Sequence, residues 1–95
     1  MRPQRRTVRR VYVKVTSDFD STGYMQPRSI TWVDGRTFPI EAVRDFCPAP
    51  SLERGRADRY TVVIHGEVRH LFFEKAGERF VSQVGRWFVE QTGFG

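Results

Sequence analysis

Apolar and polar residues alternate along several short stretches of this chain, and this pattern constrains the fold more than any other feature. From residue 11 to residue 16, three valines alternate with a tyrosine, a lysine and a threonine. A period of two with β-branched residues is typical of a half-buried β-strand. A strand is therefore expected here, and it should end at the cluster of small polar residues in 17–23.

Four more strands are expected beside turn signals, at residues 28–33, 37–43, 59–65 and 68–74. Residues 46–58 form the longest predicted loop, and Pro39 places its strand at a sheet edge or a bulge. The tail combines helical spacing at 80–88 with β formers at 86–90, so a strand is favoured over a short C-terminal helix. The predicted fold is mainly β, a small antiparallel barrel or roll of five to six strands, with that helix as the alternative for the tail.

Two tight turns set the expected register. Asp34–Gly35 is the strongest hairpin signal, and a two-residue type I′ turn is predicted there because glycine accepts a positive φ. This turn would place Thr31 opposite Phe38. A second tight turn is predicted at Gly66–Glu67. Pairing across it should place five core residues on one face, namely Tyr60, Val62, Ile64, Leu71 and Phe73. Of the two tryptophans, Trp87 in the tail is expected to be buried and Trp32 is expected to be more exposed.

The excess positive charge of the chain lies entirely in its first ten residues. The whole sequence has 16 Lys+Arg and 11 Asp+Glu, a formal net charge of +5, and residues 1–10 hold five arginines and no acid. The body from residue 11 onward is therefore neutral overall. The expected organisation is a flexible basic arm at 1–6, a single β domain at 7–91 and a tail at 92–95.

A basic arm points to a polyanionic partner, and DNA or RNA is the leading prediction. Guanidinium groups bind phosphate in a bidentate manner, and exposed aromatic rings beside them can stack on bases. The candidate nucleic-acid-binding residues are Arg2, Arg5, Arg6, Arg9, Arg10, Arg28, Trp32, Arg36 and Arg69. The arm could equally be a solvated tail, and the alternative function is a protein-interaction or homodimerisation module that uses an edge strand or an aromatic patch.

The sequence offers no pattern for catalysis or for a cofactor. It contains no GxSxG, HExxH or phosphate-loop spacing, so a non-enzymatic protein without cofactor is expected. His65 and His70 could supply two metal ligands, but no third is evident, and no metal site is predicted. The single cysteine, Cys47, is expected to be buried. With no apolar run near the ~20 residues that span a bilayer, the prediction is a cytoplasmic protein without membrane contact.

Four stretches resemble a group of small uncharacterised bacterial proteins. They are Trp32–Ile40, Arg59–Val62, Leu71–Glu74 and Arg86–Glu90. Proteins of this group are similar in pairing a Trp-x-Asp-Gly-Arg-x-aromatic hairpin with a terminal Arg-Trp-Phe-Val-Glu strand. The resemblance covers roughly residues 10–91. It implies a compact, mostly β domain in a bacterial cytosol, and it implies no activity or catalytic residue.

Overall fold

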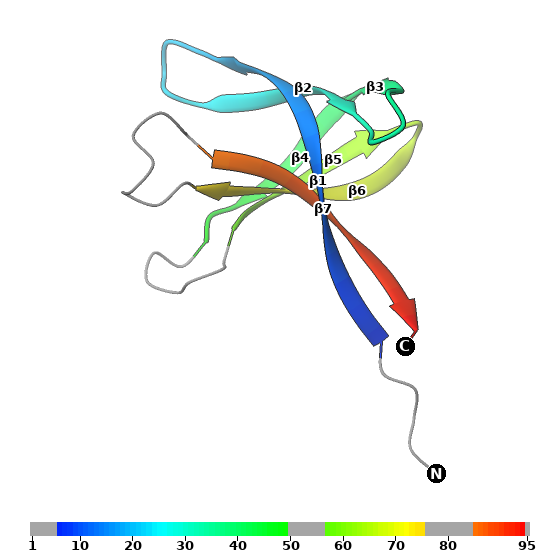
Figure 1. Cartoon of the computed structure of the whole chain (residues 1–95). Coiled ribbons are helices and arrows are strands. Elements are labelled where there is room, and N and C mark those ends of the chain that lie inside the picture. The colour runs from blue at the N-terminus through cyan, green and yellow to red at the C-terminus, as the bar shows by residue number, and fades with distance from the viewer. Residues whose placement is uncertain (1–5, 50–56, 76–84, 95) are drawn as a thin grey trace.

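The computed structural model describes residues 6–49, 57–75 and 85–94, and these form one antiparallel sheet (Figure 1). Its seven strands are β1 Arg6–Phe19, β2 Met25–Thr31, β3 Thr37–Pro39, β4 Ala42–Cys47, β5 Asp58–Ile64, β6 Glu67–Lys75 and β7 Gly85–Phe94. Their spatial order is β3-β2-β1-β7-β6-β5-β4. The mainly β antiparallel class is confirmed, but the expected count of five to six strands is wrong. The C-terminal segment is a strand along 85–94 rather than a helix.

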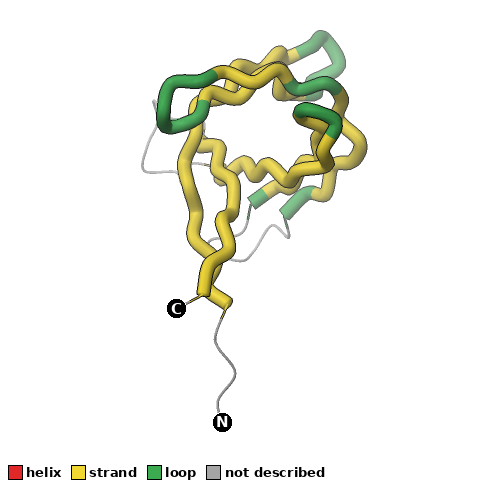
Figure 2. Tube along the Cα trace, turned by 90° about the vertical axis from the view of Figure 1, so that its right-hand side faces the viewer, coloured by secondary structure: helices red, strands yellow, loops and turns green. Residues whose placement is uncertain are grey.

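The sheet curls into a half-barrel around one interior (Figure 2). The link between β3 and β4 is hydrogen-bonded to a strand on each side of the half-barrel. Ile40 N donates to Arg28 O of β2, and Glu41 N donates to Val63 O of β5, each at 2.8 Å. The strand expected at 37–43 is therefore two strands, each at one edge of the sheet. The edge position predicted for Pro39 is confirmed. β4 also occupies the start of the predicted 46–58 loop, and its Cys47 is exposed rather than buried.

The hairpin at Asp34–Gly35 differs from the predicted type I′ turn. The register pairs Thr31 with Thr37 and Ile30 with Phe38, which leaves a longer loop. Gly35 has a φ of +90°, whereas Asp34 does not have a positive φ. The Asp34 carboxylate accepts the backbone N–H of Arg36 at 3.0 Å, and this bond holds the pKa of Asp34 below its usual value. The one-residue change of register moves Phe38 onto the face of Ile30, which is the interior.

The type I′ turn lies instead between β5 and β6. Ile64 pairs with Glu67, so the two turn residues are His65 and Gly66 rather than Gly66 and Glu67. Their φ values are 53° and 71°, as a type I′ turn requires at both positions. The imidazole of His65 packs edge-on against the Phe38 ring, with centroids 5.3 Å apart. The edge strand β3 thus meets the β5–β6 turn, which is far from it in the order of strands.

The core fills the inside of the half-barrel. The buried cluster consists of Ile30, Tyr60, Val62, Leu71, Phe73 and Trp87. The faces predicted for β5 and β6 are confirmed, because the register places Tyr60 opposite Leu71. The ring of Trp87 lies 5.3 Å from that of Tyr60 and 4.9 Å from that of Phe73, centroid to centroid. Trp87 is buried and Trp32 is half-buried, in the order that the sequence predicts.

The first and last strands extend beyond the barrel as a two-stranded ribbon (Figures 1 and 2). β1 pairs with β7 from Arg6↔Phe94 to Val13↔Trp87. β2 joins β1 only from Lys14 onward, and β6 joins β7 only up to Phe88. We call residues 6–11 and 89–94 the ribbon. Residues 92–94, expected as a tail, are the end of β7, and Arg6 begins β1.

Substitution of Gly85 tests the packing at the start of β7. A Cβ at this position would lie 2.5 Å from the Glu74 carbonyl oxygen and 2.5 Å from Cζ of Phe73. We expect Gly85→Ala to lower the free energy of unfolding by about 1–3 kcal/mol, measured by urea denaturation. Gly66→Asn is the control, because nothing lies within 4 Å of a Cβ there and asparagine tolerates its φ of +71°. Equal losses in the two variants would contradict this packing.

The buried phenol of Tyr60 makes stability depend on alkaline pH. Burial raises the pKa of Tyr60 above its ordinary value of 10.0, and the negative charge of Asp58 raises it further. The folded state therefore binds this proton more tightly than the unfolded state, so the stabilisation is full below pH 10 and is lost as pH rises through the raised pKa. We expect urea midpoints to fall above about pH 10, and to fall less in Tyr60→Phe. An equal decline in both proteins would contradict this assignment.

Candidate nucleic-acid interface

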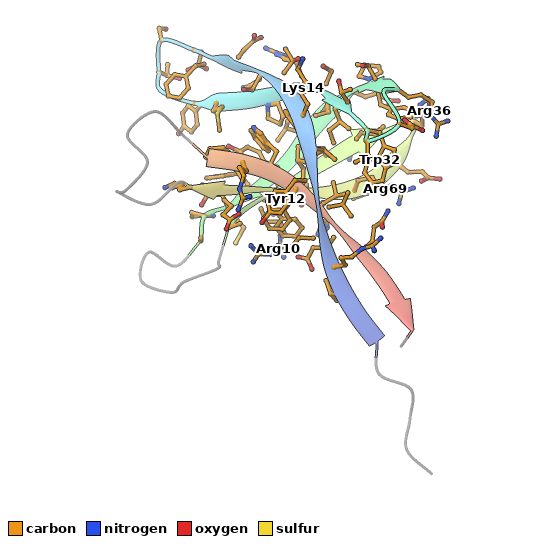
Figure 3. All side chains as sticks on the ribbon, viewed as in Figure 1. Arg10, Tyr12, Lys14, Trp32, Arg36 and Arg69 are labelled. Atoms are coloured by element: carbon orange, nitrogen blue, oxygen red, sulfur yellow. The ribbon has the colours of Figure 1, made fainter. Side chains whose placement is uncertain are left out.

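The ribbon carries the N-terminal arginines along β1. Arg6 begins the strand, whereas Arg2 and Arg5 lie outside the described residues. Successive side chains of a strand point to opposite faces, so Arg9 and Arg10 lie on different sides of the ribbon. Arg9 Nη2 donates to Oε1 of Gln91 at 3.1 Å. Arg10 instead lies on the outer face of the sheet, which it shares with Tyr12 and Lys14 (Figure 3).

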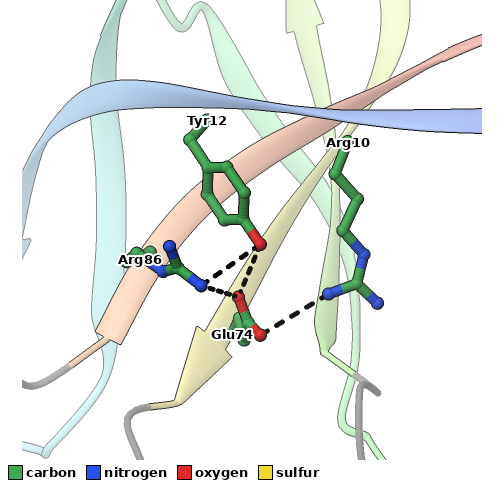
Figure 4. A network of polar contacts seen from close by, with 4 residues as sticks. All are labelled: Arg10, Tyr12, Glu74 and Arg86. Carbon is green, nitrogen blue, oxygen red and sulfur yellow. Dashed lines mark hydrogen bonds and ion pairs between the residues drawn. The ribbon is translucent and has the colours of Figure 1, made fainter.

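A network of four polar side chains lies on this outer face (Figure 4). Its centre is the Glu74 carboxylate of β6, which accepts the Tyr12 hydroxyl at 3.0 Å and Arg86 Nη2 at 3.2 Å. Arg86 Nη2 also donates to the Tyr12 hydroxyl at 3.3 Å, and Arg10 Nη1 lies 3.6 Å from Glu74 Oε1. One carboxylate thus holds two guanidinium groups from two different strands. We call these residues the Arg10–Arg86 network.

Aromatic rings support both guanidinium groups. The Arg86 guanidinium lies 4.1 Å from the centroid of the Tyr12 ring, and that of Arg10 lies 4.4 Å from the centroid of the Phe88 ring. Phe88 is itself only 1% exposed and stacks on Phe72, with centroids 5.1 Å apart and planes 9° apart. Cation–π contact and ion pairing together restrict the arginine side chains. The network carries one net positive charge, so it can offer oriented N–H donors to an anion.

A cleft opens on the side of the sheet opposite the Arg10–Arg86 network, where β6 and β7 separate. The described residues of the two strands pair from Lys75↔Gly85 to Phe72↔Phe88, and beyond Phe88 the strand β7 pairs with β1 and not with β6. The cleft at this point is lined by residues of both strands and also of β2, β3 and β5, and it has a volume of about 770 Å³. Its lining includes Ile30, Trp32, Phe38, Glu67, Arg69 and Gln91. The cleft therefore lies where the ribbon leaves the barrel.

The predicted site residues fall into separate places. Trp32 and Arg69 both line the cleft, and the Arg36 guanidinium lies 5.7 Å from the centroid of the nearby Phe38 ring (Figure 3). Arg28 lies apart from them on β2. Arg28, Arg36 and Arg69 each form an ion pair with a nearby carboxylate. The partners are Asp18 for Arg28 at 2.7 Å, Asp34 for Arg36 at 2.7 Å, and Glu67 for Arg69. These three arginines add little net charge to the surface around them.

Sequence reasoning missed Tyr12, Lys14 and Arg86 as site residues. The signal for two of them was present, because the alternation in 11–16 placed Tyr12 and Lys14 opposite the valines. Arg10 is the preceding member of the same period. Arg86 could not be added from sequence, because it reaches this face only through the pairing of β1 with β7 and of β7 with β6.

Comparison with known proteins identifies no relative. No family model matches the chain, and no curated protein or solved structure matches it significantly. The resemblance to small bacterial β proteins thus stays a prediction. Because the described residues form only strands, turns and loops, they include no helix long and apolar enough to cross a membrane.

A double-mutant cycle tests whether the Arg10–Arg86 network is a cooperative unit. The Glu74 side chain is 24% exposed, so its bond to Tyr12 is partly shielded from water. We expect Tyr12→Phe and Glu74→Gln to show a coupling energy of about 0.5–1 kcal/mol in urea unfolding. Arg28→Gln and Asp18→Asn form the control pair, since those side chains are 58% and 62% exposed and should couple by less than about 0.5 kcal/mol. A larger coupling in the control pair would contradict the network.

Proposed function

We propose that this protein binds nucleic acid through phosphate contacts made by the arginines of β1 and by the Arg10–Arg86 network. The observation that carries the proposal is the position of the charge. All of the excess positive charge lies in residues 1–10, and β1 carries residues 6–10 out along a ribbon that projects beyond the barrel. A two-stranded β-ribbon is also a shape that the grooves of a duplex can admit.

The network strengthens this proposal because its arginines are held before any ligand arrives. Arg10 and Arg86 each rest on an aromatic ring and each contact Glu74. A restricted side chain loses less conformational entropy when it binds a phosphate than a free one does. Lys14 lies on the same face two residues beyond Tyr12, about 6.6 Å along the strand. Positive groups thus follow β1 from the ribbon onto the barrel.

The proposed role is binding alone, without catalysis or a cofactor, in a cytoplasmic setting. Contacts to phosphate fix the position of a protein on nucleic acid but read no sequence. Three of the arginines that lie nearer to the barrel, Arg28, Arg36 and Arg69, are already bound by carboxylates. The proposal therefore assigns the dominant electrostatic contribution to β1 and to residues 1–5.

Self-association through an edge strand is the alternative, and β4 is the longer of the two outermost strands of the sheet. Val43 and Phe46 on β4 are 40% and 44% exposed. Two features of the strand oppose pairing with a second copy. The register shifts between Val43 and Asp45, which marks a bulge at Arg44, and the strand places two adjacent charges at its centre. Bulges and charges are the usual protection of an edge strand. The nucleic-acid proposal has the stronger support.

Salt dependence tests the proposal directly. If the five arginines of residues 1–10 each neutralise one phosphate of a duplex, log affinity should fall against log salt concentration with a slope of about −4.5. Affinity should then drop by roughly several hundred-fold when the salt concentration rises from 50 to 200 mM. Replacement of Arg6, Arg9 and Arg10 by Gln should flatten the slope by about 2.7. Titrations of labelled single- and double-stranded oligonucleotides, read by fluorescence anisotropy, measure this.

A matched variant separates position from total charge. Arg28→Gln, Arg36→Gln and Arg44→Gln also remove three positive charges, but none of them lies on β1 or in the Arg10–Arg86 network. The slope of this control should stay near that of the unaltered protein. Equal flattening in both triple variants would refute the assignment to β1. Absence of binding at 50 mM salt, together with a mass in sedimentation that rises with concentration, would favour self-association instead.

A further inference from the structure

The cleft between β6 and β7 is bordered by two strand edges that have no strand partner there among the described residues. Residues 67–71 of β6 pair with β5 on one side, and residues 89–94 of β7 pair with β1 on one side. On the sides that face each other, the ladder of described residues stops at Phe72↔Phe88. Backbone N–H and C=O groups along both edges can therefore bond to a molecule placed between them.

The interior of the cleft suits a flat, largely apolar ring. Trp32 and Phe38 supply aromatic surface, and Ile30 and Val89 supply aliphatic surface. Polar groups at the cleft include the Gln91 amide and the ion pair of Arg69 with Glu67. A volume of about 770 Å³ lies within the range of clefts that hold small ligands. A ring could thus stack on aromatic surface while its edge bonds to the walls.

Charge in the cleft disfavours a phosphate as its occupant. The lining carboxylates are Glu67 and Glu90, and the lining guanidinium of Arg69 is already bound by Glu67. A phosphate group inside the cleft would lie near these carboxylates, whereas an uncharged ring with hydrogen-bonding edges would not be repelled by them. Nucleobases are rings of this kind, and proteins hold unpaired bases by stacking and by bonds to their edges.

The ribbon connects this cleft to the proposed phosphate contacts. Gln91 lines the cleft, and its amide oxygen accepts the Arg9 guanidinium at 3.1 Å. We propose that the cleft binds one unpaired base of a single-stranded nucleic acid whose phosphates follow the ribbon. This inference rests on the proposed function and adds a preference for single strands. A duplex keeps its bases stacked and would have to extrude one to fill the cleft.

An abasic oligonucleotide tests the cleft separately from the ribbon. The probes are a labelled oligothymidylate and an abasic deoxyribose-phosphate chain of equal length and charge, titrated against the full chain at 50 mM salt. Stacking of one base should make the thymidylate bind about 5- to 100-fold more tightly than the abasic chain. Trp32→Ala should remove most of this difference by weakening only thymidylate binding, and Trp32→Phe should retain part of it. Arg9→Gln should weaken both probes.

Tyr24→Ala is the matched control, because Tyr24 is 67% exposed and does not line the cleft. It should change neither affinity. If the two probes bind equally well and Trp32→Ala affects neither, the cleft assignment is overturned and the phosphate contacts of the proposed function stand. If neither probe binds at 50 mM salt, the proposed function is overturned as well. Should Trp32→Ala fail to fold, Trp32→Phe and quenching of Trp32 fluorescence by oligothymidylate in Trp87→Phe give the same decision.

Discussion

The pairing of the first strand with the last holds this molecule together. β1 and β7 form a ladder from Arg6↔Phe94 to Val13↔Trp87, and in the order of the described strands this ladder joins β3-β2-β1 to β7-β6-β5-β4. The same ladder brings Val13 and Trp87 together on the inside and Tyr12 and Phe88 together on the outside. The core and the candidate interface are therefore two sides of one strand pair, and each depends on its register.

The outer side of this pair shows how a small sheet can use both faces. Inside, apolar burial provides most of the stability, as expected for a chain of this size. Outside, Phe88 is 1% exposed because Tyr12, Phe72 and the Arg10 guanidinium surround it. The Arg10 guanidinium lies on the buried Phe88 ring and the Arg86 guanidinium on the exposed Tyr12 ring, so both are better fixed than ordinary surface arginines. Ordered positive groups of this kind are well suited to a polyanion.

Local patterns in the sequence predicted the elements better than their connections. The period of two in 11–16 and the faces of β5 and β6 are correct, because burial on one side repeats every second residue whatever the partner strand. The turn at Asp34 was assigned wrongly because its length depends on a bond between Asp34 and the Arg36 backbone, which the dipeptide does not reveal. The basic arm could be recognised from composition, but the Arg10–Arg86 network could not. Tyr12 and Arg86 meet only through strand pairing across 74 positions of sequence.

The ribbon and the cleft have a common origin in the pairing of β7. This strand pairs with β6 along Gly85–Phe88 and with β1 along Trp87–Phe94, so the two ladders overlap only at Trp87 and Phe88. After Phe88 it follows β1, and the edge of β6 is left open. The divergence that projects the arginines from the barrel therefore also creates the cleft beside them. A ribbon of two strands is marginally stable alone. A polyanion bound along it would add contacts to it, so the proposed ligand and the shape of the ribbon would stabilise each other.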